Sequence, residues 1–255
     1  MSVAQVTVIL PVFNGELTLA RAVKSILHQT YPHWKLLLLD DGSTDATLEI
    51  AHSFQDFRTT VISDGLHKGI VERLNQGVEL ADTPYIARMD ADDFSLPERL
   101  EQQIHFLENA PQIDLVGTAI HLVGPTGEVI GKRIFSTSHS GIVSKPWLKT
   151  ISIAHPTWCG RTAWFKKWTY HDFSRNEDQE LLLRAAASST YSNLSTPLLE
   201  YTFKNNFYQN FKTRLSWLIV LVKHYLKRGQ FIELFLGISV FFVKIFLDFL
   251  RKLLH

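Results

Sequence analysis

The sequence contains a single cysteine, Cys159, and carries almost no net charge, +1 at pH 7. One cysteine excludes a framework of disulfide bonds within the chain and is typical of a reducing compartment. A near-neutral balance gives no electrostatic reason to expect a nucleic-acid partner. The apolar run VTVILPVF, residues 6–13, is too short for a secretory signal and too rich in β-branched side chains. We therefore expect a cytoplasmic protein.

The sequence also has no Gly-x-Gly-x-x-Gly or Walker loop, no internal repeat and no low-complexity linker. Dinucleotide-binding and P-loop functions therefore lack support. Hydrophobic residues make up 45% of the 255 residues and charged residues 20%, which is enough apolar material for a sizeable core. This balance predicts an ordered chain with one large domain, or one domain and an appendage.

Strand-like and helix-like segments alternate in the first half of the chain. Apolar runs typical of buried strands cover residues 6–12, 35–43, 59–63 and 84–89, and helical spacing covers residues 16–29, 43–54, 68–81 and 96–109. This alternation predicts an α/β fold with a mostly parallel, doubly wound sheet. After residue 111 the pattern changes, and residues 113–135 predict a hairpin whose turn is GPTG, residues 124–127.

Polar segments follow three of the predicted strands: FNGE (13–16), DDGS (40–43) and MDADD (89–93). Ligands of doubly wound sheets bind at the carboxyl ends of strands, so these segments predict one site. Three carboxylates in MDADD repel one another, so they lie in solvent or a positive group lies among them. Oxygens of Asp90 and Asp92 would suit Mg²⁺ or Mn²⁺. A solvated acidic loop is the alternative.

Four segments together resemble family 2 glycosyltransferases, which have the GT-A fold. They are VILPVFNGE (8–16), LLLLDDGSTDAT (36–47), MDADD and NEDQELLLR (176–184), in the order and spacing of that family. The resemblance covers residues 6–185. It implies an inverting transfer of a sugar from a nucleotide-sugar, usually UDP-linked, assisted by a divalent metal, Mn²⁺ or Mg²⁺.

The resemblance implies a nucleotide pocket at the ends of the first two strands. Pro11 and Phe13 would line it, with Phe13 stacked on the base, a contact worth about 1–3 kcal/mol. Most relatives have tyrosine at this position, so a hydroxyl contact is missing here. Glu16 would lie near the base or ribose, and Asp41 would accept the uracil N–H while Asp40 shapes the turn. An ordinary Asp-Gly turn is the alternative for this pair.

The same resemblance assigns the acidic motif and a lysine to the sugar-diphosphate. Asp90 would approach the ribose or the metal, Asp92 would be the main metal ligand, and Asp93 would support Asp92 from behind. A cation there would stabilise negative charge that grows on the leaving diphosphate. Lys68 would face the diphosphate, and a solvated lysine is the alternative.

The resemblance places the catalytic base at the second position of a Glu-Asp pair, which is Asp178. Asp178 would take the proton of the acceptor hydroxyl, and a helix cap is the alternative role for this segment. His155, Trp158 and Arg161 are further candidates for contacts with the sugar, the acceptor or a phosphate. Structural roles are the alternative for each of them.

Residues 204–255 form a basic and very apolar tail outside the resemblance. They hold nine Lys or Arg and two acidic residues, a balance of +7 that leaves −6 for the rest of the chain. The apolar segments 215–226 and 231–254 are interrupted by Glu233, Lys244 and Asp248. Each charge at a bilayer centre would cost about 2.5–3.5 kcal/mol. Helices lying on anionic lipid are therefore favoured over a membrane span, with a dimer or core helix as a further alternative.

These observations predict a GT-A domain over residues 1–203 and a membrane-associating tail over 204–255. Residues 1–110 would bind the nucleotide-sugar and residues 111–203 the acceptor. We expect an inverting glycosyltransferase that moves a hexose or N-acetylhexosamine from a UDP-sugar to a lipid-linked or saccharide acceptor. The acceptor would be a polyprenyl-diphosphate sugar or a lipopolysaccharide core, in cell-surface polysaccharide synthesis at the inner face of the cell membrane.

Two other functions remain open on the residues. A nucleotidyltransferase also combines an α/β sheet with an acidic metal site, but it would be expected to have a glycine-rich basic loop after the first strand. A non-catalytic nucleotide-sugar-binding module would be expected to lack a metal or base carboxylate, and this chain has them all.

Overall fold

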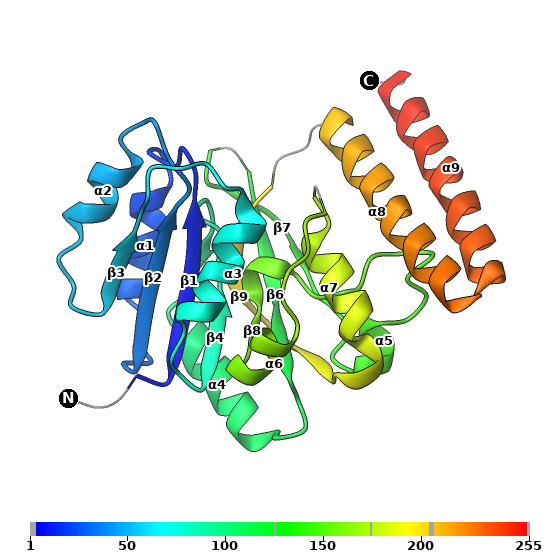
Figure 1. The fold of residues 1–255 in the computed structure, drawn as a ribbon. Coiled ribbons are helices and arrows are strands. Elements are labelled where there is room, and N and C mark those ends of the chain that lie inside the picture. Colours follow the sequence, from blue (N-terminus) through cyan, green and yellow to red (C-terminus); the bar gives the residue numbers. More distant parts are fainter. Residues whose placement is uncertain (1–3, 125, 174, 204–206, 254–255) are drawn as a thin grey trace.

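The computed structural model describes residues 4–124, 126–173, 175–203 and 207–253 (Figure 1). One sheet has the strand order β3-β2-β1-β4-β8-β6-β9-β5, with β7 paired to β6. Helices cover both faces of this sheet, and two long helices, α8 and α9, stand at one end of the molecule (Figure 1). The predicted α/β class is confirmed.

The first half of the sheet is parallel. Its strands are β1 (Val6–Val12), β2 (Trp34–Asp40), β3 (Thr59–Ile62) and β4 (Tyr85–Arg88), and its helices are α1 (Leu19–Leu27), α2 (Thr47–Ser53) and α3 (Ile70–Leu80). Strand β1 lies between β2 and β4, with Val12 opposite Asp40 and Ile9 opposite Arg88. Each connecting helix returns the chain to the same edge, which is why all four strands point the same way.

Alternate side chains of these strands enter two separate cores. Val8 and Leu10 of β1 pack with α1 and with α4 (Arg99–Asn109), whereas Ile9 packs with Leu74 and Val78 of α3. Both faces of the strands are therefore buried, which explains why their sequences are continuous apolar runs without polar alternation.

The second half of the sheet mixes strand directions. It consists of β5 (Phe94–Ser95), β6 (Leu115–Val123), β7 (Val129–Arg133), β8 (Cys159–Arg161) and β9 (Tyr191–Thr202), with α5 (His139–Ile142), α6 (Thr162–Lys167) and α7 (Glu177–Ala185). Strand β8 joins β4 to β6 through antiparallel pairing on both sides. The predicted hairpin is confirmed as β6 and β7, with Ile120 opposite Arg133, although Pro125 of its turn lies outside the described residues.

The C-terminal segment folds into two helices that lie side by side, α8 (Phe207–Arg228) and α9 (Phe231–Leu253) (Figure 1). Val220, Leu221 and Tyr225 of α8 are buried in the same core as α7. The predicted tail therefore packs, through α8, against the α/β part of the chain. Within the described residues, no helix combines the length and apolar character needed to cross a bilayer.

One ion pair and one hydrogen bond explain two of the charges that interrupt the apolar run of α9. Asp248 accepts a hydrogen bond from Arg214 of α8, whose Nε also lies 2.8 Å from the carboxylate. Lys244 Nζ donates to the backbone carbonyl of Leu148, 2.6 Å away. These contacts hold α9 against α8 and against the loop that follows α5.

Candidate active site

The three polar segments meet at one edge of the sheet, as predicted. FNGE, DDGS and MDADD follow β1, β2 and β4, and β1 is paired in parallel with both other strands. Backbone and side-chain hydrogen bonds hold the first two segments together. Asn14 N–H donates to Ser43 Oγ at 2.9 Å, and Asn14 Oδ1 accepts from Thr44 N–H at 2.9 Å.

Asp41 holds the loop that leads into α3. Its carboxylate accepts hydrogen bonds from the backbone N–H groups of Lys68 (2.8 Å) and Gly69 (3.0 Å) and from Arg73 Nε (3.0 Å). The buried Arg73 also donates to Asp64 Oδ1 at 2.6 Å. Hydrogen bonds from Arg73, then Lys68, hold the pKa of Asp64 well below its usual range. Asp41 is therefore already engaged with protein donors, and its contact with uracil stays a prediction.

The candidates around this loop occupy different positions. Phe13 is 46% exposed, and its ring centroid lies 4.2 Å from that of His67, so one aromatic platform is available to a base. Pro11 is buried within β1, and Glu16 Oε2 accepts from Ala46 N–H at 3.2 Å. Lys68 Nζ pairs with Asp64 at 2.6 Å, so its contact with a diphosphate would require it to leave that carboxylate.

A positive group does lie among the MDADD carboxylates. It is Arg88, the last residue of β4, whose buried guanidinium donates from Nη1 to Asp90 Oδ2 at 2.7 Å. Carboxylate oxygens of Asp90, Asp92 and Asp93 all lie within 4.8 Å of one another. The motif is thus a partly buried cluster with its own counter-charge, and the solvated-loop alternative does not apply.

Asp93 is more central to this cluster than predicted. It is 1% exposed, its Oδ1 accepts from Thr202 N–H at 2.9 Å, and its Oδ2 has no hydrogen-bond partner among the described residues. Burial, then the charge of Asp90, raises the pKa of Asp93 to about 8. An unpartnered buried oxygen among converging carboxylates fits a hard divalent cation, so Asp93 joins Asp92 and Asp90 as a candidate ligand.

A cleft of about 850 Å³ opens beside the acidic cluster. Residues from several segments that are distant in the sequence line it, among them Arg88, Asp90, His155, Glu177, Asp178 and Tyr201. Its volume suits a ligand of nucleotide-sugar or oligosaccharide size. The cleft therefore brings Asp178, the predicted base, to the same cavity as the end of β4.

The acidic pair Glu177 and Asp178 lies in the first turn of α7. Burial, then the neighbouring charge of Asp178, raises the pKa of Glu177 to about 7. Burial also raises the pKa of Asp178, and a hydrogen bond from Gln179 Nε2, 3.2 Å from Asp178 Oδ2, works in the opposite direction. The helix N-terminus and the charge of Arg88 favour the ionised forms. Two interacting acids whose pKa values are both raised suit proton transfer.

Of the three further candidates, only His155 reaches the cleft. Its Nε2 lies 2.9 Å from the hydroxyl of Tyr170, and burial, then the charge of Arg88, lowers the pKa of His155 well below its usual range. Its imidazole is therefore neutral and suited to hydrogen bonding with a sugar hydroxyl.

The expectations for Trp158 and Arg161 were wrong. Trp158 is 0% exposed and packs among Tyr170, Trp164 and Phe165, so it cannot stack on a sugar ring. Arg161 donates from Nε to the carbonyl of Ile113 (3.1 Å) and from Nη2 to that of Leu107 (2.9 Å). Its guanidinium fastens the end of α4 instead of facing a phosphate.

The sequence analysis missed Arg73, Arg88 and Tyr201. The first two had a signal, because each arginine interrupts an otherwise apolar face of a helix or strand and so requires a buried partner. Tyr201 lines the cleft, and burial, then Asp90, raises its pKa to about 12. No motif around Tyr201 in the sequence indicated a place in the site, because β9 reaches the cleft from a distant part of the chain.

Comparison with known families matches residues 7–168 to the model described as glycosyl transferase family 2. The chain belongs to this family. Among family relatives, EpsE of Bacillus subtilis, described as a glycosyltransferase, is 41% identical over 145 residues, which are 55% of this chain and 52% of EpsE. WfgD of Escherichia coli, named a UDP-Glc:α-D-GlcNAc-diphosphoundecaprenol β-1,3-glucosyltransferase, is 34% identical over 102 residues, 40% of each chain. The chain spans about half the length of EpsE and less of WfgD.

Solved structures confirm the GT-A fold. S. aureus TarS, residues 1–349, superposes with a TM-score of 0.70 at 19% identity, over 94% of this chain and 72% of that chain. Its complex with UDP-GlcNAc gives a TM-score of 0.66 at 19% identity, over 86% of this chain and 66% of that chain. The mannosyltransferase PcManGT of Pyrobaculum calidifontis, in complex with GDP-Man and Mn²⁺, gives 0.65 at 14% identity, over 94% and 74%. The predicted family and fold are therefore confirmed.

The raised pKa of Glu177 predicts a pH-dependent stability. Its pKa rises from an ordinary 4.5 to about 7 in the folded state, so the folded protein holds this proton more tightly than the unfolded chain. That contribution is present at low pH and is lost as pH rises through about 7. Glu177→Gln should therefore raise the free energy of unfolding at pH 8 by up to about 3 kcal/mol, and by much less at pH 5.

Urea unfolding at pH 5 and pH 8 measures this difference. Glu79→Gln, an exposed glutamate on α3, is the matched control and should change stability little at either pH. An equal effect of Glu177→Gln at both pH values would show that the folded state does not raise the pKa of Glu177.

Proposed function

We propose that this member of glycosyl transferase family 2 transfers a hexose or N-acetylhexosamine from a UDP-sugar to a lipid-linked saccharide, with inversion at the anomeric carbon. The observation that carries the proposal is the shared cleft, which Asp90 enters from the end of β4 and Asp178 from the start of α7. Donor and acceptor chemistry require such groups to face one cavity, because bond formation and bond breaking occur at one carbon.

Asp178 is proposed to receive the proton of the acceptor hydroxyl. As that oxygen forms its bond to the anomeric carbon, the bond from this carbon to the diphosphate oxygen breaks, and the electron pair leaves with the UDP. Attack from the face opposite the diphosphate inverts the centre. A positioned base contributes about 10²–10⁴-fold to such a step. Asp178 lines the cleft with its carboxylate held by Gln179, which is the positioning that this role needs.

The acidic cluster is proposed to hold Mn²⁺ or Mg²⁺ through Asp92, with Asp90 and Asp93 in reach. When bound, the cation would supply positive charge for the leaving diphosphate. Residues of this chain position the carboxylates. Arg88 pairs with Asp90. Thr202 donates from its backbone N–H to the Asp93 carboxylate and from its hydroxyl to the backbone carbonyl of Asp92. PcManGT, which has this fold, holds Mn²⁺ together with GDP-Man and supports the proposal.

The acceptor is proposed to be a saccharide on a lipid diphosphate, presented at the inner surface of the cell membrane. WfgD, which acts on such an acceptor by its name, supports this class. Exposed apolar side chains also follow one face of α9: Phe231, Ile232, Phe235, Phe242, Val243, Phe246 and Leu247, each between 47% and 75% exposed. Lys223, Lys227 and Arg228 at the end of α8 provide cations for anionic lipid.

The metal assignment predicts the behaviour of Asp92→Asn. Loss of the main ligand should weaken UDP binding by about tenfold or more when Mn²⁺ is present, and should leave it unchanged in excess chelator. Calorimetric titration of UDP under both conditions measures this. Asp82→Asn, at the opposite edge of the sheet and paired only with Lys35 in the described structure, is the control. Metal-independent weakening, or equal transfer activity in chelator, contradicts the assignment.

The base assignment predicts different results for two neighbouring acids. Asp178→Asn keeps the size but removes the basicity, so kcat should fall about 10²–10⁴-fold while UDP affinity stays unchanged. Glu177→Gln should lose much less. The measurement is kcat at saturating UDP-sugar and GlcNAc-diphosphoundecaprenol after a donor screen, with the anomeric configuration of the product read by NMR. A near-normal rate for Asp178→Asn would contradict the assignment of the base to Asp178. An inactive Glu177→Gln enzyme would assign the base to Glu177 instead.

The membrane assignment predicts that the apolar face of α9 is needed for binding to lipid. The double variant Phe235→Glu and Phe242→Glu should no longer sediment with vesicles of anionic phospholipid, and high salt should weaken binding of the unchanged protein. Phe57→Glu, which replaces a still more exposed phenylalanine beyond α2, is the control and should bind normally. Vesicle binding that survives the α9 double variant would exclude this face as the contact.

A further inference from the structure

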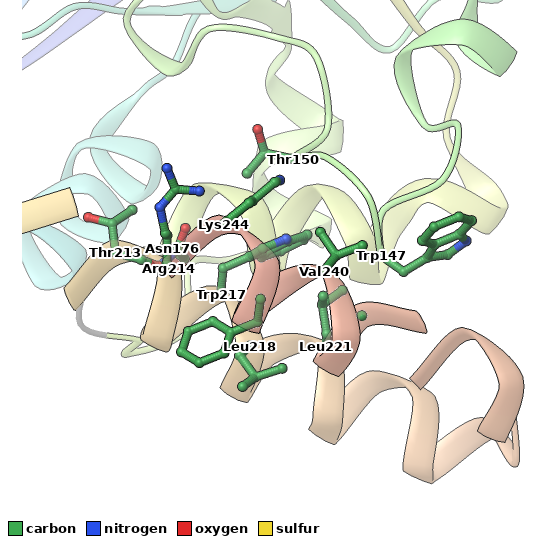
Figure 2. Close-up of a pocket in the computed structure, with 12 residues that line it drawn as sticks. Trp147, Thr150, Asn176, Thr213, Arg214, Trp217, Leu218, Leu221, Val240 and Lys244 are labelled. Atoms are coloured by element: carbon green, nitrogen blue, oxygen red, sulfur yellow. The ribbon is translucent and has the colours of Figure 1, made fainter. Parts of the chain in front are cut away.

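A second hollow lies against the cleft, between α8, α9 and the loop that follows α5 (Figure 2). We refer to it as the helix slot. It has a volume of about 100 Å³, and apolar side chains make up most of its wall: Trp147, Trp217, Leu218, Leu221, Val240 and Phe241. Figure 2 shows these residues arriving from both helices and from the loop.

The helix slot adjoins the reaction cleft. Thr150 and Thr213 line both hollows. Asn176 lines the slot and donates from Nδ2 to the carbonyl of Thr213 at 2.9 Å, while Asp178, two residues further along, lines the cleft. The slot therefore lies beside the cleft, on the side of the proposed base, Asp178.

Basic side chains line both hollows. Arg133 and Lys149 line the cleft, and Arg214 and Lys244 line the slot. Arg214 pairs with Asp248, and Lys244 donates to the carbonyl of Leu148. A ligand that occupied both hollows would thus have one end in the polar cleft beside Asp178, a middle part beside the basic side chains, and its other end in the apolar slot. That order matches a saccharide, a diphosphate and a hydrocarbon chain.

We propose that the helix slot binds the first segment of the polyisoprenyl chain of a diphosphate-linked acceptor. This rests on the proposed function, because the saccharide of that acceptor would lie at Asp178. An apolar protein cavity of about 150 Å³ stays dry and binds benzene, so about 100 Å³ accommodates one short branched hydrocarbon unit. An acyl chain of a bilayer phospholipid fits the apolar wall too, but it gives no reason for a wall shared with the reaction cleft.

Gly237 provides a way to close the slot. It lies buried on α9, and a Cβ atom there would be 3.3 Å from Leu221 Cδ1 and 3.6 Å from Trp147 Cβ. Alanine therefore fits after a small movement of a flexible side chain, whereas the larger side chain of Gly237→Leu projects into the space. Gly237→Ala is the matched control for the loss of glycine itself.

The experiment measures calorimetric binding of farnesyl diphosphate and of inorganic diphosphate to the full chain and to both variants. The unchanged protein should bind farnesyl diphosphate about tenfold or more tightly than inorganic diphosphate, because a five-carbon unit is buried. Gly237→Leu should lose that advantage and Gly237→Ala should keep it. Val240→Phe, from the other side of the slot, is the second blocking variant if Gly237→Leu does not fold.

Three results would overturn the proposal. Farnesyl and inorganic diphosphate could bind equally, or the blocking variants could bind farnesyl diphosphate normally. The blocking variants could also lose only their binding to phospholipid vesicles, which would assign the slot to a bilayer acyl chain. UDP binding with Mn²⁺ is measured on the same samples. Its absence from the unchanged protein would contradict the proposed function, whereas its presence without farnesyl selectivity would contradict the slot alone.

Discussion

The buried guanidinium of Arg88 is the interaction on which the rest of the site depends. It ends a central strand and donates to Asp90, and its charge lowers the pKa values of Asp93, Glu177 and Asp178, opposing the effect of their burial. An ion removed from water costs several kcal/mol unless a partner of opposite charge compensates it. Arg88 therefore reduces the cost of ionising the carboxylates that β4 and α7 place around one cleft. Arg99 supports the arrangement by donating to the carbonyl of Arg88 at 2.6 Å.

The acids of α7 illustrate a conflict between stability and activity. Their burial raises the pKa values of Glu177 and Asp178, because the ionised carboxylates are less stable in the fold than in water. The same burial brings their titration towards neutrality, where a general base is most useful. The start of α7 reduces the cost, because unpaired backbone N–H groups at a helix N-terminus favour negative charge. Stability is thus given up at the place where reactivity is needed.

Much of the catalytic half was predictable from local sequence. The apolar runs of β1 and β2 are buried on both faces, and the polar segments that follow them meet because parallel strands end together. The assignments of Trp158 and Arg161 failed for a related reason. Short polar or aromatic stretches do not reveal which way each side chain turns, and Arg161 satisfies backbone carbonyls of Leu107 and Ile113 that lie far away in the sequence. A guanidinium suits a carbonyl and a phosphate alike.

The sequence by itself determined the alternation of strands and helices, the position of the carboxylates at strand ends and the amphipathic character of the C-terminal segments. These are properties of neighbouring residues, set by backbone periodicity and turn chemistry. Only the tertiary structure decided that the charge of Arg88 compensates the charges of Asp90 and of the acids on α7. It also decided that an unpartnered oxygen of Asp93 points towards the acidic cluster. Finally, it decided that α8 packs into the core and leaves the helix slot beside the cleft. These are contacts between distant segments, and their energies depend on burial and on separation in space, which spacing along the chain does not specify.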